Sequence, residues 1–390
     1  MTNETNVNDK HKCDAGATSI AMTFVGDICL AGGMQPTIRD FGPDHPFSAV
    51  SKAFKTANIV VGNLECCISE KNDDGSDPPK NVMTIPADLA LGLATSGVNV
   101  VCLSNNHILD GGIVGLTSTF EFLDRHNIKY FGAGRNLEEA ECPLFMEING
   151  LKIAFLGACD APVVYGTASK CGVPPLDAKR LSQRVLKCKK EADVVVVSIH
   201  ADLEFSPYPS PSRVRLSRWL VHQGADLIIQ HHPHVCQGVE RHGDGLIAYS
   251  LGNFVFNVHG NEYLNRHAGT DWGLILHVFI ERQRSNRDIK YQLVPVTIGA
   301  SNQVAASKGE QRERQLRLLA EFSHGLADWR VIRRARMKRC VAELRMQAFG
   351  LYYLWRRRGL VTAVREVIRV LQSAYERRWM YSLLSMGIFG

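Results

Sequence analysis

The runs Asp193-Val-Val-Val-Val-Ser-Ile-His200 and Ala225-Asp-Leu-Ile-Ile-Gln-His-His-Pro-His-Val-Cys236 decide the fold of this 390-residue chain. Short apolar runs rich in valine and isoleucine are typical of buried strands, so each run predicts a strand that delivers histidines at its end. Open α/β sheets place their sites at the carboxyl ends of such strands. Neutral imidazoles gathered there suit a transition metal such as zinc, manganese or iron. The histidines in question are His200, His231, His232 and His234.

The composition is that of a globular protein. Hydrophobic residues make up 45% of the chain, which is enough for one large domain or two. The eleven cysteines include no Cys-x-x-Cys, which favours reduced thiols in a cytosol over a disulfide framework. Residues 1–18 are polar and predict a disordered lead-in without the apolar core of a secretory signal. No run is long enough to span a membrane, so we expect a cytoplasmic protein.

Positive charge is concentrated at the C-terminal end. Residues 308–390 carry 18 Lys and Arg against 7 Asp and Glu, while the whole chain has a net charge of +6. The apolar spacing there becomes helical, which predicts a basic α-helical extension over 306–390 after a domain over 19–305. The extension could pack on that domain or contact an anionic polymer, a synthase or the inner membrane face. Nucleic acid is not expected, because no nucleic-acid module accompanies the charge.

Earlier strands also end in polar side chains. Apolar runs at 19–25, 58–62 and 98–103 lead into Gly26-Asp27, Asn63-Leu-Glu65 and Ser104-Asn-Asn-His107. A buried strand that repeatedly ends in Asp, Glu, Asn or His is hard to explain by packing alone. These ends therefore predict the oxygen ligands that the histidines lack.

The remaining pattern predicts a layered α/β sandwich. Helices are expected over 47–57, 112–125, 177–191 and 212–222, between the strands. Asn149-Gly150 joins two apolar runs and predicts a β-hairpin. The run from Leu246 to Phe254 predicts one further strand, and 273–280 with 291–298 predict an antiparallel pair. Strands that first alternate with helices and then pair directly are typical of layered sheets covered by helices.

The strand-end residues suggest a two-metal site. One carboxylate flanked by imidazoles can hold two divalent ions about 3.5–4 Å apart, which polarise a substrate and ionise a water. Pro233 separates His232 from His234, so both rings can face one side. In Asn106-His107 the amide oxygen can bind a metal while the imidazole donates a proton to a leaving group.

Six motifs in this order carry a resemblance to a known family. Over residues 20–300 the chain resembles the poly-gamma-glutamate capsule biosynthesis family (CapA-like), a branch that resembles the calcineurin-like metallophosphatases. The resemblance implies a four-layer αββα sandwich with two divalent ions, of manganese, zinc, iron or magnesium. The motifs are Gly26-Asp27, Asn63-Leu-Glu65, Ser104-Asn-Asn-His107-x-x-Asp110, His200-x-x-x-Glu204, Gly224-Ala-Asp226 with His232-Pro-His234 and Gln237, and Tyr249-Ser-Leu-Gly-Asn253-Phe.

The resemblance also implies a role for each motif residue. Asp27 would bind the first metal, Glu65 would bridge, and Asn106 would bind the second metal. The metal shell is completed by His200, His232 and His234. His107 would be the catalytic acid with Asp110 beside it, and Asp110 and Glu204 would orient imidazoles. Substrate or supporting contacts are expected from Asn63, Asn105, Glu204, His231 and Asn253.

Three positions depart from the family pattern. Cys29 stands where calcineurin-like enzymes carry a histidine, so the metal on that side could be weaker, absent or bound by the thiolate. Asn63-Leu-Glu65 replaces an Asp-centred motif, so either Asn63 or Glu65 could reach the metals. Ala201-Asp202 replaces Trp-Gly and could alter the substrate pocket.

The expected function is a metal-dependent hydrolase that acts on an anionic polymer or phosphoester during capsule or exopolymer synthesis or processing. The bond attacked would be a phosphoester or an amide. A general metallophosphoesterase unrelated to capsule is one alternative. A non-catalytic assembly factor that binds polymer or a membrane synthase through its basic tail is another.

Overall fold

A computed structural model describes residues 18–71, 75, 82–283, 286–358, 361 and 364–365. The lead-in predicted over 1–18 lies outside the described residues except for Thr18, which begins the first strand. The strands are β1 (Thr18–Ile28), β2 (Ile59–Leu64), β3 (Cys67–Ile68), β4 (Thr84–Ile85), β5 (Val100–Cys102), β6 (Lys129–Phe131), β7 (Leu144–Ile148), β8 (Leu151–Cys159), β9 (Val194–His200), β10 (Leu227–His231), β11 (Val239–His242), β12 (Gly245–Ala248), β13 (Asn253–Val255), β14 (Trp272–Gln283), β15 (Asn286–Ile298) and β16 (Val304–Ala306).

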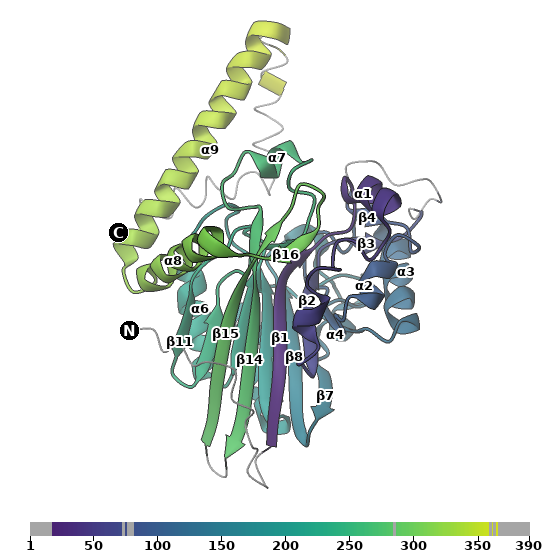
Figure 1. Ribbon diagram of the computed structural model, residues 1–390, viewed down its shortest axis with the longest axis vertical. Helices are drawn as coiled ribbons and strands as arrows, with labels where there is room; N and C mark the ends of the chain where they lie inside the picture. The colour runs from purple at the N-terminus through teal and green to yellow at the C-terminus, as the bar shows by residue number, and fades with distance from the viewer. Residues whose placement is uncertain are drawn as a thin grey trace.

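Two β-sheets form the centre of the protein (Figure 1). The larger sheet has the order β16-β15-β14-β1-β2-β5-β6, and β13 pairs with β1 beyond that path. The smaller sheet has the order β11-β12-β10-β9-β8-β7, and β3 pairs separately with β4. Parallel pairing of β1 with β2, of β2 with β5, and of β9 with both β8 and β10 aligns the carboxyl ends of these strands.

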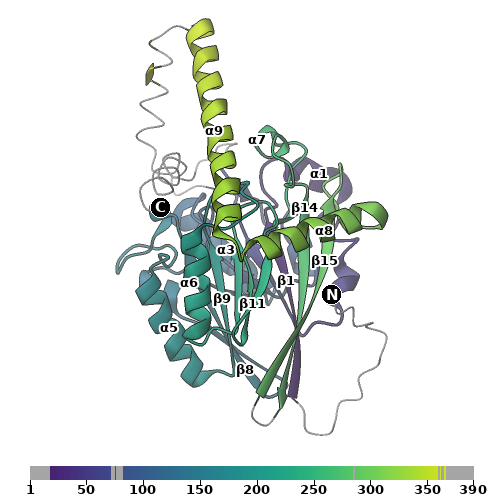
Figure 2. The ribbon, with the colours of Figure 1, turned by 90° about the vertical axis from the view of Figure 1, so that its left-hand side faces the viewer.

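Helices cover the outer faces of the sheets. In Figure 2, α5 (Ala178–Glu191) and α6 (Pro211–His222) lie beside β9 on the outside of the smaller sheet, and they share a buried cluster with its outward-facing side chains. Helices α1 (Met34–Phe41) and α3 (Gly112–Arg125) share another cluster with the larger sheet. The helices are α1 (Met34–Phe41), η1 (Ser51–Phe54), α2 (Leu91–Thr95), α3 (Gly112–Arg125), α4 (Leu137–Glu141), η2 (Pro162–Val164), α5 (Ala178–Glu191), α6 (Pro211–His222), α7 (Glu262–Asn265), α8 (Gly309–Gly325) and α9 (Trp329–Arg358).

The side chains of β1 alternate between two apolar layers. Ile20, Met22 and Phe24 belong to the apolar layer between the two sheets, while Val25 belongs to the layer under the helices. This period of two follows from strand geometry. The protein is therefore a layered mixed α/β structure with helices at its C-terminal end.

Most predicted elements are confirmed, including the Asn149-Gly150 hairpin. Asn149 has φ 51° and Gly150 has φ 73°, as a two-residue turn between β7 and β8 requires. The helix predicted over 47–57 is wrong, because this segment consists of turns and the short 3-10 helix Ser51–Phe54.

The single strand predicted from Leu246 to Phe254 is also wrong. The run divides into β12 in the smaller sheet and β13 in the larger sheet. Gly252, at φ 68°, occupies the left-handed region that glycine adopts without a steric penalty. The chain thus changes sheets at a glycine that apolar patterning does not distinguish.

The C-terminal helices are confirmed within the described residues. Helix α8 buries Leu319, and the first half of α9 buries Ile332 and Cys340. The second half of α9 extends away from the sheets (Figure 1). None of the described helices is both long and apolar enough to cross a membrane. The domain boundary predicted between 305 and 306 falls within β16, and it stays a prediction.

Candidate metal centre

The ends of the parallel strands bring the polar motifs together. Asp27 at the end of β1 lies opposite Asn63 of β2 on one side and Asn253 of β13 on the other. In the smaller sheet, His200 at the end of β9 lies opposite His231 at the end of β10. The two sheets therefore present their functional edges to each other, as the strand pattern predicted.

Gly26 allows β13 to approach Asp27. A Cβ atom on Gly26 would lie 2.0 Å from the carbonyl oxygen of Gly252, a distance that no side chain can accept. The backbone N–H of Asp27 donates a hydrogen bond of 3.0 Å to that same carbonyl. The Gly26-Asp27 pair thus fixes the aspartate against the segment that changes sheets.

Two groups of possible metal ligands share one carboxylate. The first consists of Asp27, Glu65 and His200, and the second of Glu65, His232 and His234. Within each group the ligand atoms lie within 4.8 Å of one another, and all five side chains are buried. Glu65 Oε1 lies 3.4 Å from His200 Nε2 and 3.8 Å from His234 Nε2. Both groups fit divalent ions in their mixture of carboxylate and imidazole donors.

Glu65 is the group that most clearly requires a cation. Its side chain is fully buried, and neither carboxylate oxygen has a hydrogen-bond partner among the residues that the structure describes. Burial, with the negative charges of Asp27 and Glu204, raises the pKa of Glu65 well above its ordinary value. An ionised carboxylate in such a position needs a compensating positive charge. Bound metal would supply it.

The surrounding groups are in suitable protonation states for ligands. Burial and the neighbouring His232, His231 and His234 lower the pKa of His200 well below its ordinary value, so its imidazole is neutral and keeps a lone pair. Burial alone would raise the pKa of Asp27, but contacts with the imidazoles hold it below the ordinary value. His231 Nδ1 lies 3.2 Å from Asp27 Oδ1 and supports this carboxylate.

The backbone around Pro233 is strained where it presents the histidines. His232 has φ 95° and His234 has φ 56°, both in the left-handed region that side chains other than glycine seldom adopt. Such strain concentrates at functional sites. It places the His232 and His234 rings 6.1 Å apart, and both contribute atoms to the group around Glu65. His234 Nδ1 is held by Asn253 Oδ1 at 2.9 Å.

Three asparagines at strand ends of the larger sheet support the centre, and one of them, Asn106, reaches the smaller sheet. Asn63 Nδ2 donates to Asp27 Oδ1 at 2.9 Å, and Asn105 Nδ2 lies 3.3 Å from Asn63 Oδ1. Asn106 Oδ1 lies 2.7 Å from His200 Nε2, so its oxygen could bind the same ion as that ring. Of the two residues left open by the sequence, Glu65 belongs to both ligand groups, while Asn63 supports Asp27.

His107 is oriented beside the centre by Asp110. His107 Nδ1 lies 3.0 Å from Asp110 Oδ2, and the same carboxylate oxygen accepts a hydrogen bond of 2.7 Å from Met83 N. The His107 side chain is 27% exposed, unlike the buried ligands. Its Nε2 is therefore the ring nitrogen that can face a substrate.

Cys29 lies outside both ligand groups of the described residues. Its Sγ is 3.9 Å from Met83 Sδ. A hydrogen bond with Cys66 and burial raise the pKa of Cys29 well above its ordinary value, which disfavours a thiolate. Glu204, expected to orient an imidazole, accepts a hydrogen bond from the Tyr263 hydroxyl and contributes to the pKa of Glu65 by its charge.

Aromatic groups around His234 were missed by the sequence reasoning. The Phe205 ring lies 6.3 Å from the His234 ring, and Phe256 packs edge-on against His234 at 5.1 Å. Phe205 follows Glu204 of the fourth motif and has φ 60°. Its position directly after Glu204 was the one feature of the sequence that could have indicated its place beside the centre.

A comparison with protein-family models matches residues 21–258 to the bacterial capsule synthesis protein family PGA_cap. The chain belongs to this family. The capsule biosynthesis protein CapA of Bacillus anthracis is 33% identical to this PGA_cap member over 248 residues, covering 61% of this chain and 60% of that protein. The PGA biosynthesis protein CapA of Bacillus subtilis (strain 168) is 32% identical over 242 residues, covering 61% and 63%. Each match spans less than two thirds of the relative's length.

Similarity to solved structures is more distant. A putative 5'-nucleotidase from Staphylococcus aureus, solved in complex with alpha-ketoglutarate, has 15% sequence identity and a TM-score of 0.47, covering 78% of this PGA_cap member and 58% of that chain. The two ligand groups lie within the family match, whereas β14, β15 and the C-terminal helices follow it. The family match thus includes the residues of the candidate metal centre but not the C-terminal helices.

Proposed function

We propose that this protein is a metal-dependent hydrolase that acts in synthesis or processing of a poly-gamma-glutamate type capsule or exopolymer. The observation that carries the proposal is the buried Glu65 carboxylate, which belongs to two groups of ligand atoms and has no hydrogen-bond partner in the described part of the chain. A catalytic site for two divalent ions would use one carboxylate in this way. We assign the layered sheets and helices to the four-layer αββα sandwich of calcineurin-like metallophosphatases.

The proposed ligands are those of the two groups together with Asn106, namely Asp27, Glu65, Asn106, His200, His232 and His234. Bound divalent ions, of manganese, zinc, iron or magnesium, would polarise a phosphoester or amide and lower the pKa of a water to near neutrality. His231 and Asn63 hold Asp27, and Asn253 holds His234. These contacts fix the ligand side chains before any ion arrives.

His107 is the proposed general acid. Asp110 holds Nδ1, which leaves Nε2 to give a proton to the departing oxygen or nitrogen. Asp110 therefore acts as a positioning residue rather than as a second acid.

Metal reconstitution tests the proposal. Protein stripped by a chelator would be reloaded with each of the four metals and offered aryl phosphates, phosphodiesters and gamma-glutamyl amides. We expect metal-dependent turnover of at least one class, and its loss in Glu65→Gln. Full turnover after complete stripping would overturn the proposal. Turnover confined to generic aryl phosphates would favour a general metallophosphoesterase unrelated to capsule.

A non-catalytic role as an assembly factor has one observation in its favour. The outer part of α9 exposes Tyr352 and Trp355, which are 54% and 49% accessible, beside Arg356. Aromatic and basic side chains together suit an anionic membrane surface or a membrane synthase. A Tyr352→Ser, Trp355→Ser variant should then lose flotation with anionic vesicles while keeping its metal. Contact through 308–390, and with it a location at the inner membrane face, stays a prediction.

A further inference from the structure

The loop over 201–206 follows His200 and contains two residues with a left-handed backbone. Asp202 has φ 98° and Phe205 has φ 60°. Residues other than glycine keep such a conformation only where surrounding contacts impose it. The loop lies beside the candidate metal centre, because His200 belongs to the first ligand group. The contacts that hold Asp202 and Phe205 therefore determine the shape of a segment next to the centre.

Arginines of α9 contact both of these residues. Arg336 Nη1 donates a hydrogen bond to Asp202 Oδ1. Arg339 Nε donates to the Glu204 carbonyl oxygen at 3.1 Å, and its guanidinium carbon lies 5.2 Å from the centroid of the Phe205 ring. A cation over the face of an aromatic ring is attracted to it. Since the two arginines are three positions apart, they lie on one face of the helix, and this face holds both strained residues.

Phe205 connects α9 to the loop that carries the histidines. Its backbone N–H donates a hydrogen bond of 2.8 Å to the Pro233 carbonyl oxygen, and its ring centroid lies 6.3 Å from that of His234. His232 and His234 flank this proline with positive φ, and both belong to the second ligand group. A chain of contacts thus runs from α9 through Phe205 to the peptide between two proposed metal ligands.

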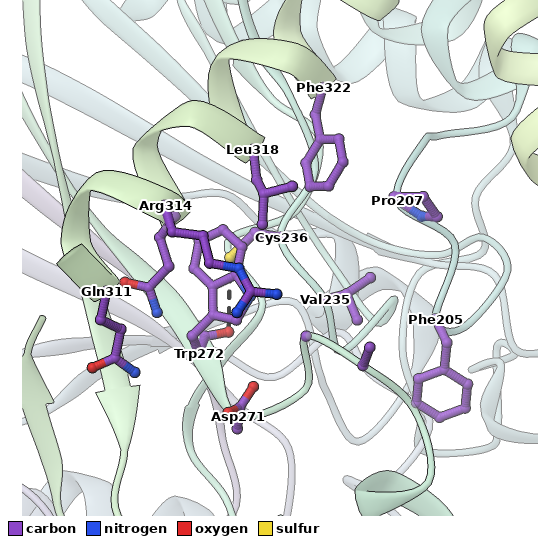
Figure 3. A pocket seen from close by; sticks show the side chains of 13 residues that line it. Phe205, Pro207, Val235, Cys236, Asp271, Trp272, Gln311, Arg314, Leu318 and Phe322 are labelled. Carbon is purple, nitrogen blue, oxygen red and sulfur yellow. Dashed lines mark hydrogen bonds between the residues drawn. The ribbon is translucent and has the colours of Figure 1, made fainter.

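Close packing does not hold the Phe205 ring on every side. Phe205 and Val235 line a cavity of about 530 Å³ that reaches side chains of α8 (Figure 3). A ring beside empty space lacks partner atoms there. The contacts of the ring include His267, stacked at 3.9 Å, and Tyr263, edge-on at 5.2 Å. Loss of Arg339 would therefore leave the ring with one contact fewer and with space into which it can shift.

We propose that Arg339 is a positioning residue for the metal ion of the second ligand group, and that it acts through Phe205 and the Pro233 carbonyl. It would hold the strained histidine loop in the form that presents both rings to Glu65. The first ligand group should depend on it less, because Asp27 and the other ligands there are fixed by strand pairing.

This support comes from outside the family match. Helix α9 begins at Trp329, whereas the match ends at residue 258. Family membership therefore does not describe the contact between Arg339 and the centre. The inference rests on the metal centre of the proposed function, but it does not depend on hydrolysis.

The test titrates the metal-free full-length protein with Co²⁺, whose visible absorption changes with its ligands, against a competing chelator. We expect the parent to bind two ions, and His234→Gln to identify the ion of the second ligand group. Arg339→Met should weaken that ion by about tenfold to a hundredfold, as is typical when a group that orients a metal ligand is lost. Phe205→Leu should weaken the same ion. Arg339→Lys, which keeps a cation over the ring, should weaken it less than Arg339→Met does.

Lys338→Met is the matched control. Lys338 is the neighbouring residue of α9 and is exposed, so its loss should change either affinity by less than about twofold. Urea unfolding of the metal-free proteins is measured in parallel. If Arg339→Met lowers the free energy of unfolding but leaves both Co²⁺ affinities unchanged, the role of Arg339 is merely structural and the proposal is overturned.

Two further results would also overturn it, namely equal weakening of both ions by Arg339→Met and equal weakening by Lys338→Met and Arg339→Met. A parent that binds no Co²⁺ would overturn this inference together with the metal centre. The expected effect of Arg339→Met in a protein that hydrolyses none of the substrates would leave the inference standing and count against the proposed function alone.

Discussion

Asp202 Oδ1 accepts a hydrogen bond of 2.9 Å from Arg336 Nη1, although the two residues lie 134 positions apart in the chain. Both side chains are buried, at 6% and 4% exposure. Asp202 lies two residues after His200, and Arg336 lies on α9, so this pair ties the C-terminal helix to a loop of the metal centre. Arg339 strengthens the tie by donating from Nε to the Glu204 carbonyl oxygen at 3.1 Å.

Arg336→Met should destabilise the protein by about 3–5 kcal/mol, because it leaves the Asp202 carboxylate buried without its partner. Urea unfolding at pH 7 would measure the change. Arg334→Met, at an exposed position of the same helix, should stay within about 0.5 kcal/mol of the parent. Similar losses in both variants would show that α9 is not held by this pair.

The free energy of unfolding should decrease as the pH is lowered below neutrality, because the folded protein keeps His267 neutral. Burial, followed by the charge of Arg339, lowers the pKa of His267 to about 4. The unfolded chain takes up this proton first, near its ordinary pKa of about 6.5. The contribution of neutral His267 to the free energy of unfolding is therefore complete above about pH 6.5, and it is lost as the pH falls toward 4.

Comparison with His267→Gln isolates this effect from that of other histidines. The free energy of unfolding of the parent should decrease more between pH 7 and pH 5 than that of the variant. Loss of the stacking between His267 and Phe205, whose centroids are 3.9 Å apart, lowers the variant's stability at both pH values and cancels in the difference. Parallel pH profiles would contradict the expectation.

Gly26→Ala should damage both stability and the centre. Its Cβ would meet the Gly252 carbonyl oxygen at 2.0 Å, so β13 or Asp27 must move, at a cost of about 1–3 kcal/mol. Gly299→Ala is the matched control, since its nearest neighbour would be Gln303 O at an ordinary 3.5 Å. Thermal unfolding and metal content would be measured together. An unchanged metal content in a destabilised Gly26→Ala protein would argue against a positioning role.

His107→Gln should reduce turnover by about 10²–10⁴-fold on substrates with poor leaving groups, because a general acid is lost. Substrates whose leaving group needs no proton, such as nitrophenyl esters, should be affected much less. The measurement is kcat of the parent and of His107→Gln on both types of substrate, and the loss of kcat in the variant is compared between the two types. Equal loss on both would assign His107 a structural role rather than proton donation.

Local chemistry made much of this fold predictable from the sequence. The Val and Ile runs before His200 and His231 form adjacent buried strands, and Asn149-Gly150 forms the expected turn. Gly26-Asp27 and Asn63-Leu-Glu65 bring their side chains to one edge because parallel strands end together. These features depend on neighbouring residues and on strand direction, which a sequence displays.

Contacts between distant segments were not predictable in the same way. The split of β12 from β13 depends on close approach of Gly26 and Gly252, and the pairing of Asp202 depends on where α9 folds back. The sequence marked Asp202 only as a departure from the family pattern. A cavity is similarly lined by side chains of α8 together with Trp272 at the start of β14. Such features follow from tertiary packing and have no local signature.

Whether Glu65 holds divalent metal is tested directly by the metal content of the purified protein and of its Glu65→Gln variant, measured by elemental mass spectrometry. Glu147→Gln, at an exposed position of β7, serves as the control. The parent and Glu147→Gln should retain divalent metal through gel filtration, while Glu65→Gln should lose most of it. A Glu65→Gln protein that keeps the full metal content of the parent would contradict a metal centre built on Glu65.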